Sequence, residues 1–198
     1  KDESFQRINL EGCTKLVALP GKIFEKMKFL VLLNLRGCIL LSSLPEMNII
    51  SLKTLILSGC TNLEEFQPIS NSLEVLHLDG TAIKGLPPDM KNLQSLVLLN
   101  LKNCTKLECL PNCLGVLKAL EELILSGCTN LKNLSDVRES MKHLLSLLMD
   151  KIGVKEMPNI SCITISEDQA CADTVLQPVG PSGWPREVHG VSSLQRLC

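Results

Sequence analysis

The sequence LILSGCTNL occurs twice in this chain of 198 residues, at Leu55–Leu63 and again at Leu123–Leu131. The two copies begin 68 positions apart, three times a spacing of about 22 to 23 residues that is typical of stacked-repeat proteins. Weaker copies fill the interval between them and flank it on both sides. The second apolar anchor of each copy falls at Ile8, Leu33, Leu55, Leu76, Leu99, Leu123 and Leu147. We therefore predict about seven repeats within residues 1–158.

Apolar residues alternate with other residues around each anchor, as Leu76 and Leu78 do in the fourth copy. An alternation with a period of two predicts a strand with one buried face. One short strand cannot bury its own leucines, but stacked copies form a parallel sheet over a continuous core. The repeat length and the pattern L-x-x-L-x-L-x-x-N/C are those of leucine-rich repeats. We predict an α/β solenoid: a leucine-rich-repeat horseshoe or arc with a parallel concave β-sheet and short helical or irregular convex returns.

The segments that return the chain to the next strand are of two kinds. Apolar residues three and four positions apart, the pattern of a short helix, occur in GKIFEKMKFL from Gly21, PDMKNLQSL from Pro88 and PNCLGVLKAL from Pro111. The returns PEMNIIS from Pro45 and QPISNS from Gln67 are too short for a helix. We expect extended or turn-like backbone in those two.

The composition agrees with a leucine core and excludes several classes of protein. The chain has 39 leucines, no tyrosine and one tryptophan. Its net charge of −1 provides no electrostatic footprint for nucleic acid. No apolar run approaches the roughly 18–20 residues of a membrane span, and the opening KDESFQRINL is no signal peptide. We expect neither a nucleic acid nor a membrane nor a small-molecule substrate as a partner.

Five of the ten cysteines occupy one position of the repeat, five residues after the anchor. They are Cys13, Cys38, Cys60, Cys104 and Cys128, and Thr81 and Ile152 fill the same slot in two other repeats. A slot that accepts Cys, Thr or Ile is a small packed position rather than a metal ligand. We predict buried thiols, each donating a weak hydrogen bond to a carbonyl of the next turn. We expect no disulfide, metal or cofactor, as suits a reducing compartment.

The pattern changes after Pro158, where only three further leucines occur. Residues 159–190 are rich in proline and glycine and predict an irregular insert or loop-rich tail. Residues 191–198 repeat the leucine spacing that opens each earlier unit and predict the start of a truncated further repeat. Solenoids need polar caps, and neither end of this sequence has one. We expect a fragment of a longer protein or a truncated gene product.

The variable residues beside the anchors are predicted to line the concave face. Six of them are apolar, and an apolar patch rimmed by polar groups is typical of a partner-binding surface; a patch covered by a flanking domain is the other explanation. The candidate protein-binding residues are Leu32, Asn34, Arg36, Thr54, Ile56, Val75, His77, Asp79, Leu98, Asn100, Lys102, Ile124 and Leu148.

Two pairs of opposite charges are predicted to face each other on adjacent strands. Glu11 adjoins Arg36, and Asp79 adjoins Lys102, in the column that follows the strands. Such pairs stabilise a sheet by about 0.2–1 kcal/mol each. Catalysis has no support in the sequence: the three histidines are isolated from plausible partners, and no G-x-S-x-G or H-E-x-x-H motif occurs. We expect a protein that is not an enzyme.

Three kinds of unit give the sequence a family resemblance: the pattern LNLxGCTxLxxLP, LKTLILSGCTNLEEF from Leu52, and LEVLHLDGTAIKGLP from Leu73. They resemble the repeats of plant TIR-type nucleotide-binding leucine-rich-repeat (NLR) disease resistance proteins, with the closest likeness to the crucifer downy-mildew resistance group. The unit LLMDKIGVKEMP from Leu147 departs from that pattern at Lys151 and Ile152. The resemblance covers residues 5 to about 158.

This resemblance implies a protein–protein interaction module that senses a pathogen effector and contributes to autoinhibition, with the receptor's own nucleotide-binding domain as a second partner. It also implies a cytoplasmic or nucleocytoplasmic protein. No G-x-x-x-x-G-K-[ST] phosphate loop is present, so no nucleotide site is assigned. A generic leucine-rich-repeat adaptor or scaffold, such as the substrate arm of a ubiquitin ligase, is the alternative. An extracellular ectodomain is disfavoured by the cysteine pattern.

Overall fold

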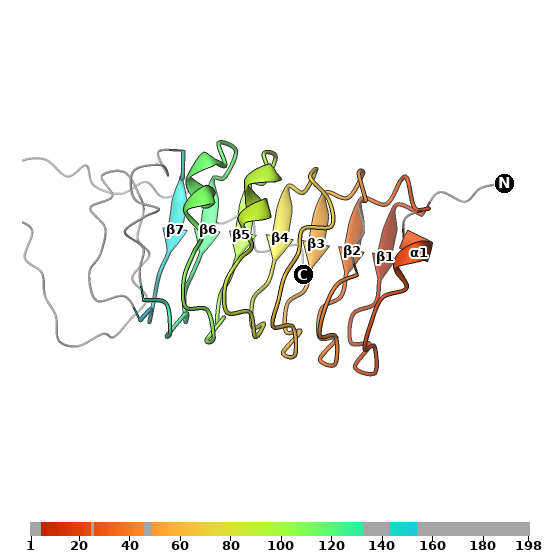
Figure 1. Cartoon of the computed structure of the whole chain (residues 1–198), viewed down its shortest axis with the longest axis horizontal. Coiled ribbons are helices and arrows are strands. Elements are labelled where there is room, and N and C mark those ends of the chain that lie inside the picture. Colours follow the sequence, from red (N-terminus) through yellow and green to blue (C-terminus); the bar gives the residue numbers. More distant parts are fainter. Residues whose placement is uncertain (1–4, 25, 46–48, 133–142, 154–198) are drawn as a thin grey trace, which may run out of the picture.

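The computed structural model describes residues 5–24, 26–45, 49–132 and 143–153. The predicted insert at 159–190 and the predicted further repeat at 191–198 lie outside these residues. The described chain forms one parallel sheet whose strands follow each other in sequence order (Figure 1). Its seven three-residue strands are β1 (Arg7–Asn9), β2 (Leu32–Asn34), β3 (Thr54–Ile56), β4 (Val75–His77), β5 (Leu98–Asn100), β6 (Glu122–Ile124) and β7 (Ser146–Leu148). The predicted leucine-rich-repeat solenoid is confirmed.

The strands pair in the register that the repeat spacing predicts. Leu76, the middle residue of β4, faces Leu55 on β3 and Leu99 on β5. In β2 to β7 the middle residue is buried and its two neighbours are half-buried. The first anchor, Ile8, is only partly buried, because no described repeat lies on its outer side. The leucine core is therefore one continuous column through the stack.

A turn with left-handed backbone follows each strand. One residue per repeat has a positive φ there, a region that glycine occupies without strain and asparagine tolerates. These residues are Gly12, Gly37, Gly59, Gly80, Asn103, Gly127 and Lys151. The conformation turns the chain directly before the cysteine slot, which explains why Gly-Cys recurs in the sequence.

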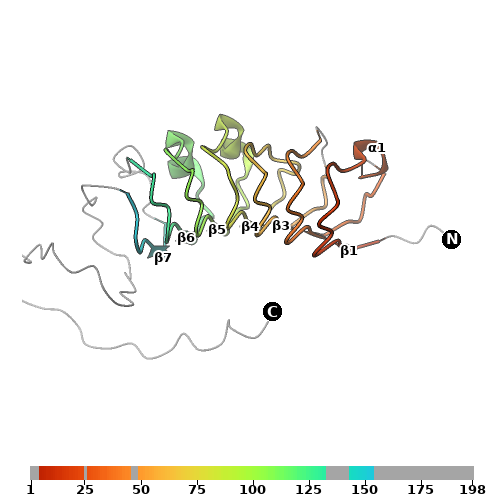
Figure 2. The ribbon, with the colours of Figure 1, turned by 90° about the horizontal axis from the view of Figure 1, so that it is seen from below.

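The convex returns match the two predicted kinds. Short helices occur in the three predicted segments: α1 (Gly21–Phe24) and the 3-10 helices η1 (Pro88–Asn92) and η2 (Asn112–Val116). Met90 and Leu114 are buried and fix η1 and η2 to the core. The described parts of the two short returns contain no helix. Figure 2 shows the helices along the edge of the arc opposite the strands.

The cysteine slot forms a ladder of thiol hydrogen bonds between repeats. Cys38, Cys60, Cys104 and Cys128 are fully buried, as predicted. Their Sγ atoms lie 3.1–3.3 Å from the carbonyl oxygens of Leu10, Leu35, Leu78 and Leu101 respectively. Each acceptor belongs to the preceding repeat, not to the next turn as the sequence suggested. Each of these carbonyls also accepts a backbone N–H of its own turn, as Leu35 does from Cys38 at 3.1 Å, so it uses both of its lone pairs.

Cys13 corrects the prediction for this slot, because it is exposed. The slot is closed by the repeat that precedes it, and no described repeat precedes the first. Thr81 also differs from the cysteines: its Oγ1 donates to the carbonyl of Leu78 in its own repeat at 2.7 Å. The same carbonyl accepts from Cys104, so threonine and thiol share one acceptor.

We predict that the four buried slot thiols resist alkylation in the folded chain. Burial raises the pKa of Cys38 and Cys104 above the ordinary 9.0, so burial suppresses the reactive thiolate and also blocks the reagent. Iodoacetamide labelling at pH 8, followed by peptide mass spectrometry, should modify the exposed Cys13 and Cys109 at least about tenfold faster. Labelling in urea, where all cysteines should react alike, is the control. Equal rates for Cys13 and Cys60 in the folded chain would reject the ladder.

Candidate protein-binding face

The candidate binding residues form two rows across the sheet and a third row just beyond it. Leu32, Thr54, Val75 and Leu98 are paired in register on β2 to β5. A second row runs from Asn34 on β2 through Ile56, His77, Asn100 and Ile124 to Leu148 on β7. The third row, Arg36, Asp79 and Lys102, lies two residues after the strands. The structure therefore gathers all thirteen candidate residues on one face.

The six apolar candidates on this face are half-buried. They are Leu32, Ile56, Val75, Leu98, Ile124 and Leu148. None of the described helices covers this face, because α1, η1 and η2 lie on the opposite side (Figure 2). The six side chains thus provide an apolar floor that a partner can contact without changing the fold.

Asparagines on the face fix the turns that follow the strands. The Oδ1 atom of Asn34 accepts from the backbone N–H of Arg36, and that of Asn100 from Lys102, both at 3.0 Å. The Nδ2 atom of Asn34 donates to Glu11 at 3.1 Å. The amides therefore hold each turn and join it to the preceding repeat.

Asp79 lies at the centre of a second interlocking arrangement. Its Oδ1 accepts from Ser58 Oγ at 2.7 Å and from Asn100 Nδ2 at 3.1 Å. Ser58 is only 4% exposed and would lose its polar partner without the aspartate. The same pairing recurs between Ser126 and Asp150 at 3.1 Å. Both serines occupy the same place in LILSGCTNL, so each copy of the repeated sequence is joined to an aspartate of the repeat that follows it.

The two predicted charge pairs are wrong. Among the described residues, no ion pair joins Arg36 to Glu11 or Lys102 to Asp79. The shorter asparagine amides bind both carboxylates instead. A long, exposed cation gains little from such a pair, since the entropy of holding it nearly cancels the attraction. Arg36 and Lys102 are therefore left exposed at the edge of the apolar floor.

His77 stands in the middle of the face, with Nδ1 3.3 Å from Asn100 Nδ2 and 3.9 Å from Asp79 Oδ1. Burial lowers the pKa of His77 below 6.5, outweighing the opposite effect of Asp79. The ring is therefore neutral at pH 7. The Asn100 amide is oriented by its bond from Lys102, so it donates to Nδ1 and the proton of the ring lies on Nε2. His77 can offer this N–H to a partner.

Sequence reasoning missed a further row at the first variable position of each L-x-x-L. Val31 and Val97 are half-buried there, and Leu145 is 66% exposed. They extend the apolar floor toward the start of the strands. The same row contains an ion pair between Lys53 and Glu74 at 2.7 Å. The sequence could have indicated this row, because its residues immediately precede those of the first predicted row.

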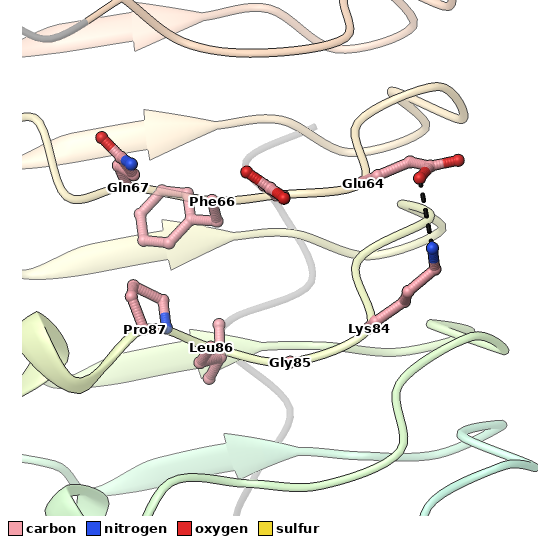
Figure 3. Close-up of a pocket in the computed structure, with 8 residues that line it drawn as sticks. Glu64, Phe66, Gln67, Lys84, Gly85, Leu86 and Pro87 are labelled. Atoms are coloured by element: carbon pink, nitrogen blue, oxygen red, sulfur yellow. Dashed lines mark hydrogen bonds and ion pairs between the residues drawn. The ribbon is translucent and has the colours of Figure 1, made fainter.

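A hollow of about 300 Å³ lies between the third and fourth repeats, away from this face. Figure 3 shows Phe66, Leu86 and Pro87 along it, with Glu64 and Lys84 joined at one end. The Glu64 carboxylate lies 3.3 Å from Lys84 Nζ and 3.7 Å from Lys106 Nζ, and the hydrogen bond from Lys84 lowers its pKa. Glu64 and Lys84, two charged residues of the hollow, already bind each other, so the sheet face remains the stronger candidate site.

Within the described ranges, no three His, Cys, Asp or Glu side chains are placed to hold a metal ion. No helix in the same part of the chain has the length and apolar character needed to cross a membrane. The face can contact a partner through its half-buried apolar side chains and through the ring N–H of His77.

Seven stacked parallel strands, a leucine column and a left-handed turn in every repeat define a leucine-rich-repeat protein. The chain is similar in structure to the leucine-rich repeat domain of the type III effector XCV3220 (XopL), with a TM-score of 0.55 and 23% identity over 81% of this chain and 64% of that one. At that identity the likeness concerns the fold alone. No protein-family model matches the chain.

Sequence comparison shows to which group of leucine-rich-repeat proteins the chain is related. The chain is 52% identical over 189 residues to the disease resistance protein RPS4 of Arabidopsis thaliana, covering 93% of this chain and 15% of that protein. It is 44% identical to RPS4B of the same plant, over 82% of this chain and 12% of that protein. By sequence, the chain belongs to the leucine-rich-repeat region of plant TIR-type NLR disease resistance proteins. It spans only 12–15% of the length of these two relatives.

Proposed function

We propose that this chain is the protein-interaction module of a plant intracellular immune receptor, which senses a pathogen effector and contributes to autoinhibition of the receptor. The observation that carries the proposal is the apolar floor on β2 to β7. The sequence identity of 44–52% to disease resistance proteins supports it. The sheet acts by binding, and its residues perform no chemistry on the partner.

Two properties of the face support this role. Its polar groups are largely bound to one another, so Asp79, Ser58 and Asn100 are satisfied without a partner. The apolar side chains beside them release water when a protein covers them.

The buried slot thiols fit an intracellular location, because reduced cysteines persist in a reducing compartment. The two relatives named above are disease resistance proteins, so they favour the receptor module over a generic adaptor.

We expect Ile56→Asp and Val75→Asp to disturb partner binding far more than folding. Each side chain lies on the outer face and is half-buried, so the cost to the free energy of unfolding should stay below about 1.5 kcal/mol. An unpaired carboxylate in the middle of the floor must be desolvated when a partner docks, which is unfavourable.

The test replaces the matching segment of RPS4 with this chain and measures cell death in leaf tissue with and without pathogen. The chimera with the parental chain should remain silent until challenged. The two aspartate variants should either signal without pathogen, if the floor contacts the receptor itself, or fail to respond to it, if the floor contacts the effector.

Val116→Asp is the matched control. Val116 is 50% exposed at the end of η2, so the same chemical change falls on the opposite side of the solenoid. It should leave the chimera's response unchanged. If Ile56→Asp and Val75→Asp accumulate and signal like the parental chimera, the concave face has no role in either partner contact.

A further inference from the structure

We propose that the concave face over β2 to β5 binds an extended acidic segment of its protein partner, with one carboxylate at Arg36, one at Lys102 and an apolar side chain between them. This proposal rests on the proposed function, since it names the chemistry of the partner for the same face. It goes beyond that function by fixing the charge, the spacing and the direction of the bound segment.

The two cations are held in place yet remain available to a partner. Asn34 and Asn100 accept from the backbone N–H of Arg36 and Lys102 and so fix where each side chain begins. Both side chains are exposed, and within the described part of the chain neither takes part in an ion pair. The carboxylates nearest to them are bound to asparagine amides instead. Two cations that the fold positions but does not neutralise are suited to anionic groups of a partner.

Asp79 determines where the partner's carboxylates can lie. It stands between the two cations, and its charge repels an anion placed over β3 or β4. Its Oδ1 is already held by Ser58 and Asn100, so it does not rotate away to pair with either cation. The favourable anion positions are therefore over β2 and β5, where Arg36 and Lys102 attract the carboxylates. The adjacent row of the sheet has Ile56 between Asn34 and His77, and Ile56 accommodates an apolar side chain of the segment.

The spacing of the strands sets the spacing of the acidic residues. Arg36 and Lys102 follow β2 and β5, which are separated by three steps between adjacent strands. Three steps of about 4.8 Å give about 14 Å, which an extended peptide spans with about four or five residues. The segment crosses the strands rather than pairing with one of them. Beyond β5 the face becomes acidic, with Glu122 on β6 and Asp150 after β7, so the continuing partner chain is neutral or basic there.

The experiment selects binders from a display library of random peptides on the immobilised 198-residue chain. Enriched peptides should contain two acidic residues about four or five positions apart around an apolar residue. A labelled copy of an enriched peptide should bind Arg36→Glu/Lys102→Glu at least about tenfold more weakly than the parental chain. Its affinity should also fall with added salt.

Lys118→Glu is the matched control, because Lys118 is exposed after η2 and the substitution reverses the same charge outside the face. Peptide binding to it should be unchanged. If the circular dichroism spectrum shows that the glutamate variant is unfolded, Arg36→Gln/Lys102→Gln replaces it in the binding experiment. This double variant removes the two charges while keeping long side chains.

Enrichment of basic or uncharged peptides, equal binding to the charge variants, or no enrichment at all would each overturn this inference. The proposed function is judged separately. Peptides that lose affinity on Ile56→Asp but not on either charge variant would leave the binding face intact and refute only the acidic partner.

Discussion

Leu76→Ala is expected to lower the free energy of unfolding by about 2–5 kcal/mol. The side chain is fully buried and lies in register between Leu55 and Leu99. Leu55 and Leu99 are held in place by the sheet register, so the surrounding core can relax into the cavity only in part. The loss should therefore include both the transfer term and the cavity term. Urea unfolding followed by circular dichroism measures it.

Val75→Ala provides the matched control for Leu76→Ala. Val75 is the adjacent residue on β4, but its side chain is half-buried on the opposite face of the strand. Its truncation should cost less than about 1 kcal/mol. The predicted register would be refuted by a loss below about 0.5 kcal/mol for Leu76→Ala, or by equal losses for both variants.

Alkaline pH is expected to destabilise the fold through the buried thiols. Burial raises the pKa of Cys60 to about 11 and that of Cys128 to about 12, from an ordinary value of 9.0. Above pH 9 the unfolded chain releases these protons while the folded chain retains them, so stability falls as the pH rises. The stabilisation is fully present below pH 9 and is lost between pH 9 and about 11 for Cys60, and up to about 12 for Cys128. Each thiol should contribute a slope of about 1.4 kcal/mol per pH unit in that window.

The control for this slope is Cys60→Thr/Cys128→Thr, which the chain itself suggests. Thr81 occupies the same slot and is buried, with its hydroxyl bound to Leu78, so threonine fits and does not titrate in this range. Urea unfolding at pH 8, 9, 10 and 10.5 should give a shallower decline for the double variant. Superimposable pH profiles for the two proteins would show that these thiols do not carry the alkaline destabilisation.

The sequence by itself determined the solenoid, its strands and the face of each side chain. The anchors from Ile8 to Leu147 recur every 21 to 25 residues. The period of two within each strand then decides which residues point inward. Identical neighbours also fix the register, because a slip by one residue would expose the whole leucine column. The lengths of the returns likewise decided where α1, η1 and η2 form, since a short return has no room for a helical turn.

The tertiary structure alone decided which groups meet across adjacent repeats. Glu11 and Arg36 lie in the same row of the sequence pattern, yet in the structure the Glu11 carboxylate accepts a hydrogen bond from the Asn34 amide. The structure also decided the acceptors of the slot thiols, which lie in the preceding repeat. It decided the exposure of Cys13 as well, since no described repeat closes that slot. Side-chain length, turn geometry and the distance between strands select one donor among several near an acceptor. A linear pattern shows which residues share a face, but hydrogen bonds depend on fractions of an ångström that only the stacked repeats determine.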